Sequence, residues 1–471
     1  MSRAANDTLA GRSARALGNA FLRKAVRFTA ERLSQAKTDS TDALGQWEAW
    51  RDRGRQVRQH VVQHLDYYLE EFAQNVEAHG QKVHFASDAR EAGDIVLRII
   101  AEKEARLVAK SKSMVSEEVG VNARLAEHGI ECLETDLGEW IIQLAHEPPS
   151  HLIIPAIHKT RDQVQQLFEK EGGERLTNDT ATLAGYARRR LRERFARAEV
   201  GMTGCNFAIA ETGSVVIFTN EGNGRMVTTL PQTHIVMMGM ERILPTLADL
   251  PLMADLLPRS ATGQKITTYV NVVTGARRQG ELDGPRELHV VILDNGRSRQ
   301  LADPLFRELL HCIRCGACLN VCPVYRHVGG HAYGSVYSGP IGAVVTPLLA
   351  PHDPAAAELA NASTLCGACF DACPVKIPLH DLLLRLRTRN VALYHPPLGE
   401  RVGIRLFAAA AAWPRLFSLL SRLVRRVLLR LGPRGERLLA RLPGVSTWAR
   451  HRSLPVLQAR SFRDQWKDLE D

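Results

Sequence analysis

Hydrophobic residues follow two different periods along this chain, and the change of period divides it into segments. In residues 1–78 they recur every three to four positions, as in Val57, Val61 and Leu65, which predicts amphipathic helices. A weak break is expected at residues 37–41, where the sequence is Lys-Thr-Asp-Ser-Thr. We therefore expect an N-terminal helical arm that packs on the next domain.

Residues 79–297 alternate between short strand-like runs and helical segments. Strands are expected at 83–85, 106–109, 130–134, 151–155, 214–219, 225–229, 234–238 and 288–293. Helices are expected at 89–104, 117–128 and 160–170. The Gly- and Asn-rich segment 220–224 predicts a hairpin that joins the strands on either side of it. Strands that alternate with helices of this length indicate βαβ units, so the predicted fold is an α/β domain with a parallel sheet.

Cysteines dominate the next segment, residues 298–390, for which we predict a helical dicluster domain. Seven of the nine cysteines lie there, in the runs Cys312-x2-Cys315-x2-Cys318-x3-Cys322-Pro323 and Cys366-x2-Cys369-x3-Cys373-Pro374. The first spacing is that of bacterial-type ferredoxins, in which three cysteines of a run hold one iron–sulfur cluster and the fourth reaches the other cluster. The sequence therefore predicts two clusters, with two [4Fe-4S] as the leading expectation.

This rule divides the seven cysteines unequally. Cluster A receives Cys312, Cys315, Cys318 and Cys373. Cluster B receives only Cys322, Cys366 and Cys369. Aligning the two Cys-Gly-Ala-Cys motifs places Ser363 where a fourth thiolate of cluster B would stand. Serine, water, a [3Fe-4S] cluster, Cys132 and Cys205 all remain open, with water or a vacant corner favoured. Zinc is the alternative metal for Cys-x2-Cys pairs, but the tight triple and the two Cys-Pro endings fit it poorly.

Positive charge is concentrated near the end of the chain. Residues 401–452 contain twelve arginines, no lysine and one acid, Glu436. This segment therefore carries a net charge of +11, whereas the whole chain carries +10. The rest of the chain is near neutral, which argues against a nucleic-acid partner. Leucine and valine side chains of 416–428 share one helical face, so residues 391–471 are expected to form a basic helical region. That face would dock on a partner subunit or lie on an anionic membrane surface.

A membrane span or a secretory signal is not expected. The most apolar stretch, Val402–Val424, is interrupted by arginines and a proline. The N-terminus has no continuous apolar core. The cytoplasm is therefore the expected location, with peripheral contact to the inner face of the cytoplasmic membrane through 401–452 as the open alternative.

Several motifs together resemble the lactate utilization protein B family. They are CIRCGACLNVCPVY and LCGACFDACPVKIP, with NFAIAETGSVV, NEGNGR, LPQTHI, ATGQKITTY and HVVILDNGR upstream. The resemblance implies an α/β domain related to sugar-phosphate isomerase and CoA-transferase-like proteins. It also implies an iron–sulfur electron-transfer subunit of a multi-protein system that oxidises L-lactate to pyruvate. Its companions would be a cysteine-rich redox protein and a cluster-free protein with a lactate-utilization domain. The absence of an eighth cysteine is the family's usual pattern.

Other candidate residues lie in the α/β domain. Glu211 weakly resembles the nucleophile of CoA transferases, although a carboxylate that accepts backbone hydrogen bonds is favoured. Residues 110–113 and 220–225 could each bind an anion, against the simpler interpretation of a solvated loop and a hairpin turn. Structural roles are expected for His151, His158 and His234. Two alternatives to a relay remain open: an enzyme that uses an open-site cluster as a Lewis acid on a small hydroxy acid, and a transferase-like activity of the α/β domain. No dinucleotide-binding or Walker-type loop occurs.

Overall fold

The computed structural model describes residues 8–394, 398–431, 458 and 460–466. The chain forms two compact units, residues 1–390 and 391–471. The first unit contains both β-sheets and all nine cysteines.

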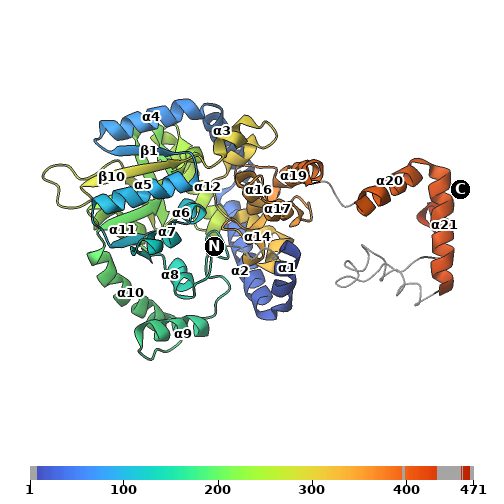
Figure 1. The fold of residues 1–471 in the computed structure, drawn as a ribbon, viewed down its shortest axis with the longest axis horizontal. Helices are drawn as coiled ribbons and strands as arrows, with labels where there is room; N and C mark the ends of the chain where they lie inside the picture. Colours follow the sequence, from blue (N-terminus) through green and yellow to red (C-terminus); the bar gives the residue numbers. More distant parts are fainter. Residues whose placement is uncertain (1–7, 395–397, 432–457, 459, 467–471) are drawn as a thin grey trace. The chain divides into compact units, whose positions relative to one another are not determined.

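A six-stranded parallel sheet is the centre of the α/β domain (Figure 1). In spatial order its strands are β1 (Lys82–Ala86), β10 (Glu287–Leu293), β7 (Thr233–Gly239), β4 (Val200–Gly204), β2 (Leu107–Lys110) and β3 (Glu131–Glu134). All five pairings are parallel. Parallel strands require crossover connections, and the alternation of strands and helices in the sequence supplies them. The predicted α/β class is confirmed.

Both faces of this sheet are buried under other elements. Successive side chains of a strand point to opposite faces, so neighbouring residues belong to different cores. Ile235 and Met237 pack with one set of helices, whereas Val236 and Met238 pack on the other face. The first face is covered by α5 (Ala89–Glu102), α6 (Met114–Val119) and α7 (Val121–Glu127). The second face meets α4 (Leu65–Ala78), a smaller sheet, α8 (Leu137–Leu144), α9 (Arg161–Gly172) and α10 (Thr180–Arg197).

The smaller sheet overturns the predicted hairpin. Its order is β8 (Ile243–Leu244), β5 (Phe207–Ile209), β6 (Ser214–Thr219) and β9 (Tyr269–Val273). Strand β6 pairs with β5 and β9, not with residues 225–229. Those residues belong to α11 (Asn223–Thr229), which follows Gly222 at φ 74°. A glycine in this left-handed conformation begins a helix here instead of closing a hairpin turn.

Two further predictions in this domain were wrong. Residues 151–155 form turns rather than a strand, and they are held by His151, whose Nδ1 accepts the backbone N–H groups of Ile153 (3.0 Å) and Ile154 (3.2 Å). The helix expected at 117–128 is divided into α6 and α7 at Gly120, which has φ 73°. The remaining helices of this region are α12 (Leu250–Thr262) and α13 (Arg297–Ala302), with the short 3-10 turns η1 (Ala210–Thr212), η2 (Met240–Arg242) and η3 (Leu247–Asp249).

The N-terminal arm contains α1 (Leu9–Gly18), α2 (Ala20–Leu44), α3 (Trp47–Gln63) and α4. The break expected at 37–41 is absent from the structure, since α2 continues through these residues to Leu44 and is capped by Gly45. The contacts of the arm are not limited to the α/β domain on which it was expected to pack. Helix α4 contacts β1 and η1, whereas α1, α2 and α3 contact the cysteine-rich segment about 300 residues later in the chain.

The cysteine-rich segment is helical, as predicted, and Figure 1 places its helices beside α1 and α2. Its elements are η4 (Arg307–His311), α14 (Ala317–Val321), α15 (Pro323–Val328), η5 (His331–Tyr333), α16 (Gly339–Leu349), α17 (Pro354–Ala357), η6 (Glu358–Asn361), α18 (Ala368–Asp371) and α19 (Leu379–Tyr394). One hydrophobic core joins these elements to α2, α3, α12 and the 152–157 loop.

The second unit contains α20 (Leu398–Ala412), α21 (Pro414–Leu431) and α24 (Phe462–Trp466). The apolar face predicted for α21 is exposed within this unit, with Leu419 62% and Leu423 58% accessible. In the described part of the chain no single helix is long and apolar enough to cross a membrane. Helices α20 and α21 together meet the length and composition requirements but are bent by 112°. Residues 432–452 of the arginine-rich stretch 401–452 lie outside the described residues.

Candidate metal centre

The four cysteines assigned to cluster A line one small cavity. Sulfur-bearing residues from both runs contribute to it, namely Cys312, Cys315, Cys318 and Cys373. The cavity is small, with a volume of about 20 Å³, and most of its other walls are apolar side chains such as Ile341 and Ile377. Burial, followed by the charge of Cys373, raises the pKa of Cys315 to about 12. Such a thiol gives up its proton only when a cation takes the proton's place.

The remaining three cysteines of the two runs form a second group. Burial, followed by the charges of Cys322 and Cys366, raises the pKa of Cys369 to about 12, so these three thiols are close neighbours. Cys322 and Cys369 are buried, whereas Cys366 is exposed. The Ser363 hydroxyl accepts a hydrogen bond from the backbone N–H of Leu365 at 3.1 Å. This group therefore lies nearer the surface than the first.

The two Cys-Gly-Ala-Cys motifs adopt the same backbone conformation. Arg314 and Leu365, which precede the motifs, have φ of 61° and 56°. Gly316 and Gly367, within the motifs, have φ of 76° and 83°. Non-glycine residues seldom take positive φ, so paired exceptions at matching positions indicate a repeated loop that directs its thiols inward.

The two cysteines outside the runs lie in the α/β domain. Cys132 is buried on β3 and donates a hydrogen bond to Asn122 Oδ1 at 3.3 Å. Cys205 follows β4, and Arg242 and Glu241 are the charged residues near it. Burial raises the pKa of each thiol to about 12. Cys132 is a buried thiol of a packed domain, whereas Cys205 is half-buried.

The geometry fits a cluster better than a single zinc ion. Four thiolates bound to one tetrahedral zinc at 2.3 Å would place their sulfur atoms about 3.8 Å apart. Among the described residues no three cysteine sulfur atoms lie within 4.8 Å of one another. Thiols from two runs that surround one site at wider separations than zinc requires are the donor set that iron–sulfur clusters take.

Cations from the N-terminal arm hold the ends of both cysteine runs. Arg51 on α3 donates to the carbonyl oxygens of Cys373 (2.9 Å) and Phe370 (2.7 Å), and Lys37 on α2 donates to that of Ala372. Arg58 donates to the carbonyl oxygens of four residues, which are Glu241, Ile243, Leu310 and His311. Sequence patterns did not reveal this role, because the partners are backbone atoms far away in the chain.

A buried ion network joins the α/β domain to the cysteine-rich segment. Arg297 bonds Glu241 (Nε–Oε2, 2.7 Å) and Glu118 (Nη2–Oε2, 2.9 Å). Tyr337 donates its hydroxyl to Glu118 Oε2 at 2.6 Å, and Arg314 pairs with Glu241 at 3.4 Å. Burial opposes the charge of Glu241, but Arg297 and Arg314 hold its pKa at about 2. The network fixes Arg314, which lies inside the first Cys-x2-Cys, against η2.

The other candidates from the sequence have protein partners. Glu211 accepts the backbone N–H of Leu247 at 2.9 Å, and Lys110 is buried between Glu117 (2.5 Å) and Glu134 (2.7 Å). His151 Nε2 lies 3.1 Å from Asn320 Oδ1, and His234 Nε2 lies 2.8 Å from Thr203 Oγ1. In contrast, Lys112 and Asn223 line a second cavity, which is described below.

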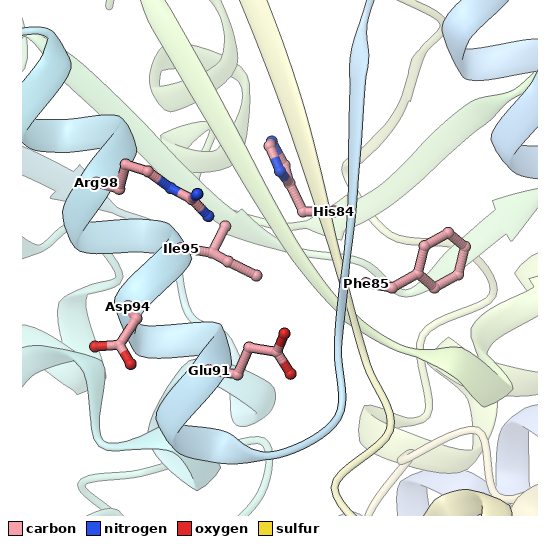
Figure 2. Close-up of a pocket in the computed structure, with 6 residues that line it drawn as sticks. All are labelled: His84, Phe85, Glu91, Asp94, Ile95 and Arg98. Carbon is pink, nitrogen blue, oxygen red and sulfur yellow. The ribbon is translucent and has the colours of Figure 1, made fainter.

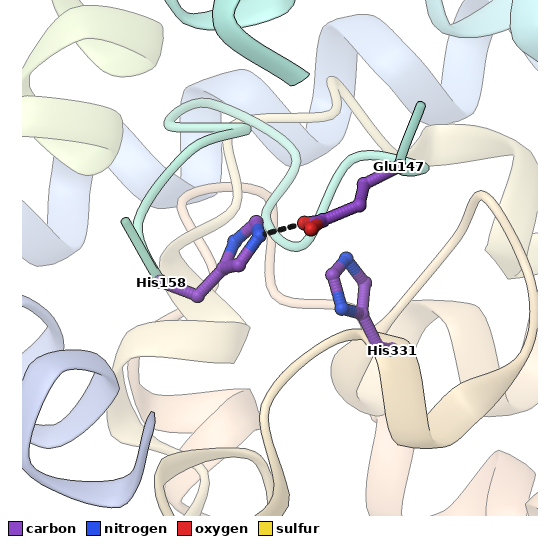
Figure 3. Close-up of side chains that lie close together, drawn as sticks. All are labelled: Glu147, His158 and His331. Atoms are coloured by element: carbon purple, nitrogen blue, oxygen red, sulfur yellow. Dashed lines mark hydrogen bonds and ion pairs between the residues drawn. The ribbon is translucent and has the colours of Figure 1, made fainter. Parts of the chain in front are cut away.

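One group of side chains has the donor atoms of a metal site, but these atoms are already paired within the protein. Figure 3 shows Glu147, His158 and His331 converging, with His158 bonded to Glu147 at 2.5 Å. Lys159 pairs with the same carboxylate at 2.5 Å, and His331 bonds the carbonyl of Pro148 at 2.8 Å. An ammonium group already neutralises the carboxylate, so the group is a structural link between the 147–159 loop and η5.

A surface groove lies between the edge strand β1 and helix α5, away from the cysteines. Figure 2 shows Glu91, Asp94, Ile95 and Arg98 on α5, with His84 directed toward the helix and Phe85 away from it. The charged side chains of α5 are exposed and of both signs. The groove therefore lacks a buried group that could select a ligand.

Comparison with known families and proteins agrees with this architecture. Residues 69–293 match the LUD domain family, residues 308–377 the 4Fe-4S dicluster domain, and residues 392–470 the lactate utilisation protein B C-terminal family. Lactate utilization protein B of Anoxybacillus flavithermus is 47% identical over 452 residues, which cover 95% of each chain. The chain belongs to the lactate utilization protein B family.

Other members of the family are similarly close. The proteins of the same name from Bacillus velezensis and Macrococcus caseolyticus are each 46% identical, over 96% and 98% of this chain and 95% and 97% of their own. A crystal structure of a duf162 family protein from Deinococcus radiodurans aligns over 49% of this chain and 98% of its own, with 15% identity and a TM-score of 0.27. Membership of the lactate utilization protein B family establishes an iron–sulfur protein with a role in lactate utilization.

Proposed function

We propose that this chain is the iron–sulfur electron-transfer subunit of a multi-protein system that oxidises L-lactate to pyruvate. The observation that carries the proposal is the arrangement of seven cysteines in two adjacent groups, four around one cavity and three nearer the surface. Cys312, Cys315, Cys318 and Cys373 would hold cluster A, and Cys322, Cys366 and Cys369 cluster B. When bound, the clusters supply one-electron oxidation and reduction.

The protein's own residues would exclude water and fix the thiols. Apolar side chains close the first cavity, while Lys37, Arg51 and Arg58 supply positive charge and hydrogen bonds to the backbone near it. Such surroundings tune the potential of a bound centre. The companion lactate-utilization subunits would dock on the chain, and the exposed apolar face of α21 is the candidate surface for that contact.

Anaerobic purification with iron and sulfide quantitation tests the cofactor part of this proposal. About eight irons per chain would correspond to two cubes and about seven to a three-iron cluster B. Cys315→Ser should remove the signal of one cluster and Cys366→Ser that of the other, whereas Cys132→Ser, a buried thiol outside both groups, should retain both. Equal iron loss from Cys132→Ser would contradict the assignment.

The electron-transfer part needs a separate measurement. L-lactate should reduce the clusters of this chain only when the companion subunits are present, which can be followed by EPR. Reduction by lactate with this chain alone would contradict the relay.

The exposed position of Cys366 supports one alternative, in which the chain is itself an enzyme that binds a small hydroxy acid at the open position of cluster B. A change in the EPR signal of cluster B on adding lactate or pyruvate to the reduced chain would favour this alternative.

A further inference from the structure

A second cavity lies where the α/β domain meets the cysteine-rich segment; we refer to it as the sheet-edge cavity. It has a volume of about 320 Å³ and is lined by residues at the carboxyl ends of β2 and β4, including Ser111, Lys112 and Cys205. Open α/β sheets bind ligands at the carboxyl ends of their strands. Arg314 and Leu152 line both this cavity and the one that contains the cluster A cysteines, so the two cavities share a wall.

Asn223, Ser111 and Thr219 lie on the wall of the sheet-edge cavity, and the side chains of Asn223 and Ser111 make no hydrogen bond within the described residues. Asn223 is 4% exposed and Ser111 is 3% exposed. The Thr219 hydroxyl is fully buried and unpaired. Buried polar groups are nearly always paired, and leaving one unpaired costs about 1–3 kcal/mol. The unpaired Thr219 hydroxyl, together with two wall side chains that make no hydrogen bond, indicates that a polar ligand completes this wall.

The same wall carries two arginines whose hydrogen-bond donors are only partly used. Arg242 is 7% exposed, and it donates one long hydrogen bond, of 3.5 Å, to the carbonyl oxygen of Cys312. No carboxylate of the described residues lies within ion-pair distance of its guanidinium. Arg314 bonds Glu241 through Nη2 at 3.4 Å, but its buried Nη1 has no partner there. A buried guanidinium needs an anion, and its planar fork matches a carboxylate.

The remaining charged residues of the cavity are already engaged. Lys112 donates to the carbonyl of Ile153 at 3.1 Å and pairs with Glu139 at 3.3 Å. Asp136 caps α8, and Glu221 accepts the backbone N–H of Leu137 at 2.9 Å. Asp136 and Glu221 therefore both accept hydrogen bonds from the start of α8. Arg242 and Arg314, in contrast, have N–H groups that are not hydrogen-bonded.

We propose that the sheet-edge cavity binds a small organic carboxylate that also carries a hydroxyl or carbonyl oxygen. Arg242 and Arg314 would receive the carboxylate, and Asn223 and Ser111 the second oxygen. The site would hold this ligand against the wall that it shares with the cluster A cavity. The proposal goes beyond the electron-transfer role, which requires no small-molecule site.

Calorimetric titration of the full chain, purified anaerobically, tests the proposal with L-lactate, pyruvate, inorganic phosphate and the neutral methyl ester of L-lactate. The two carboxylates should bind and the ester should not, because the ester lacks the charge that Arg242 requires. Phosphate binding as tight as that of lactate would show a site for any anion and overturn the carboxylate assignment, as would equal binding of the ester.

Variants separate binding from folding. Asn223→Ala removes no hydrogen bond within the described residues, so it should leave the melting temperature unchanged and weaken lactate binding roughly tenfold. Arg242→Gln should weaken it on the order of 30-fold. Arg225→Gln changes an exposed arginine close by in the sequence and is the matched control.

Unchanged affinity in Asn223→Ala, or equal losses in Arg242→Gln and Arg225→Gln, would overturn the proposal, as would the absence of binding by either carboxylate. Iron and sulfide measured in the same samples report on the clusters separately, so a failure of one proposal is distinguishable from a failure of the other.

Discussion

Arg51 provides a direct test of how the N-terminal arm supports the second cysteine run. Arg51 is only 5% exposed. Its guanidinium donates hydrogen bonds to the carbonyl oxygens of Cys373 (2.9 Å) and Phe370 (2.7 Å). Replacing it with alanine leaves both buried oxygens without these donors. Because a hydrogen bond to a charged group contributes about 1.5–3 kcal/mol, Arg51→Ala should cost about 4 kcal/mol.

The size of the unit converts this free energy into a modest temperature shift. Unfolding entropy is about 2.1 cal/mol/K per residue, or about 0.8 kcal/mol/K for a unit of 390 residues. A loss of about 4 kcal/mol therefore lowers the melting temperature by about 5 °C. Circular dichroism would follow the fold, and the visible absorbance of the clusters would follow their loss in the same sample.

Arg53→Ala is the matched control, because Arg53 lies on the same helix and is exposed. It should melt within about 1 °C of the unaltered protein, since exposed substitutions usually change stability by less than 0.5 kcal/mol. Equal melting temperatures for the two variants would refute the reasoning that the arm stabilises the second run through Arg51. Loss of cluster absorbance well below the unfolding transition in Arg51→Ala alone would show that the contact protects the clusters as well as the fold.

Two further predictions concern the body of the first unit. Burial lowers the pKa of His234 from 6.5 to about 3, so the unfolded chain binds a proton that the folded chain refuses. Stability should therefore fall as pH drops from 6.5 toward 3, and His234→Gln should make the unfolding free energy less steep by about 1.4 kcal/mol per pH unit in that window. Gly330→Ala would place a Cβ 1.8 Å from the carbonyl oxygen of Ser150, so it should lower the melting temperature or the yield of soluble protein sharply. Gly18→Ala, on α1 in open space, should leave both unchanged; a stable Gly330→Ala variant would contradict the packing.

Features encoded by local sequence were predictable, and features that depend on distant partners were not. The parallel sheet followed from the alternation of strands and helices. The predicted hairpin between residues 214–219 and 225–229 was wrong. The strand that pairs with β6 on that side is β9, which begins 50 residues beyond the end of β6. Residues 151–155 contain enough apolar side chains for a strand, yet His151 bonds Asn320 of the cysteine-rich segment and holds them as a loop.

The candidate sites show the same limit. Spacing alone divided the seven cysteines into groups of four and three, and in the structure the first four line one cavity. The place of Asn223 could not be predicted, since nothing in the segment 220–225 reveals that the first residue of α11 would line a cavity. Arg242 likewise stands in an ordinary apolar stretch, and only the fold places it against the backbone of Cys312.

The contact between Arg51 and Cys373 also sets an order for biosynthesis. The two residues are 322 positions apart, so α3 leaves the ribosome at least about 16 s before its carbonyl partners at a synthesis rate of 20 residues per second. During that interval Lys37 and Arg51 have no oxygen atoms of the second run to bind. The cavity of the cluster A cysteines likewise has no fourth thiol until Cys373 is made. Completion of the cluster A site and docking of the arm on the second run therefore cannot precede the synthesis of residue 373 of the 471.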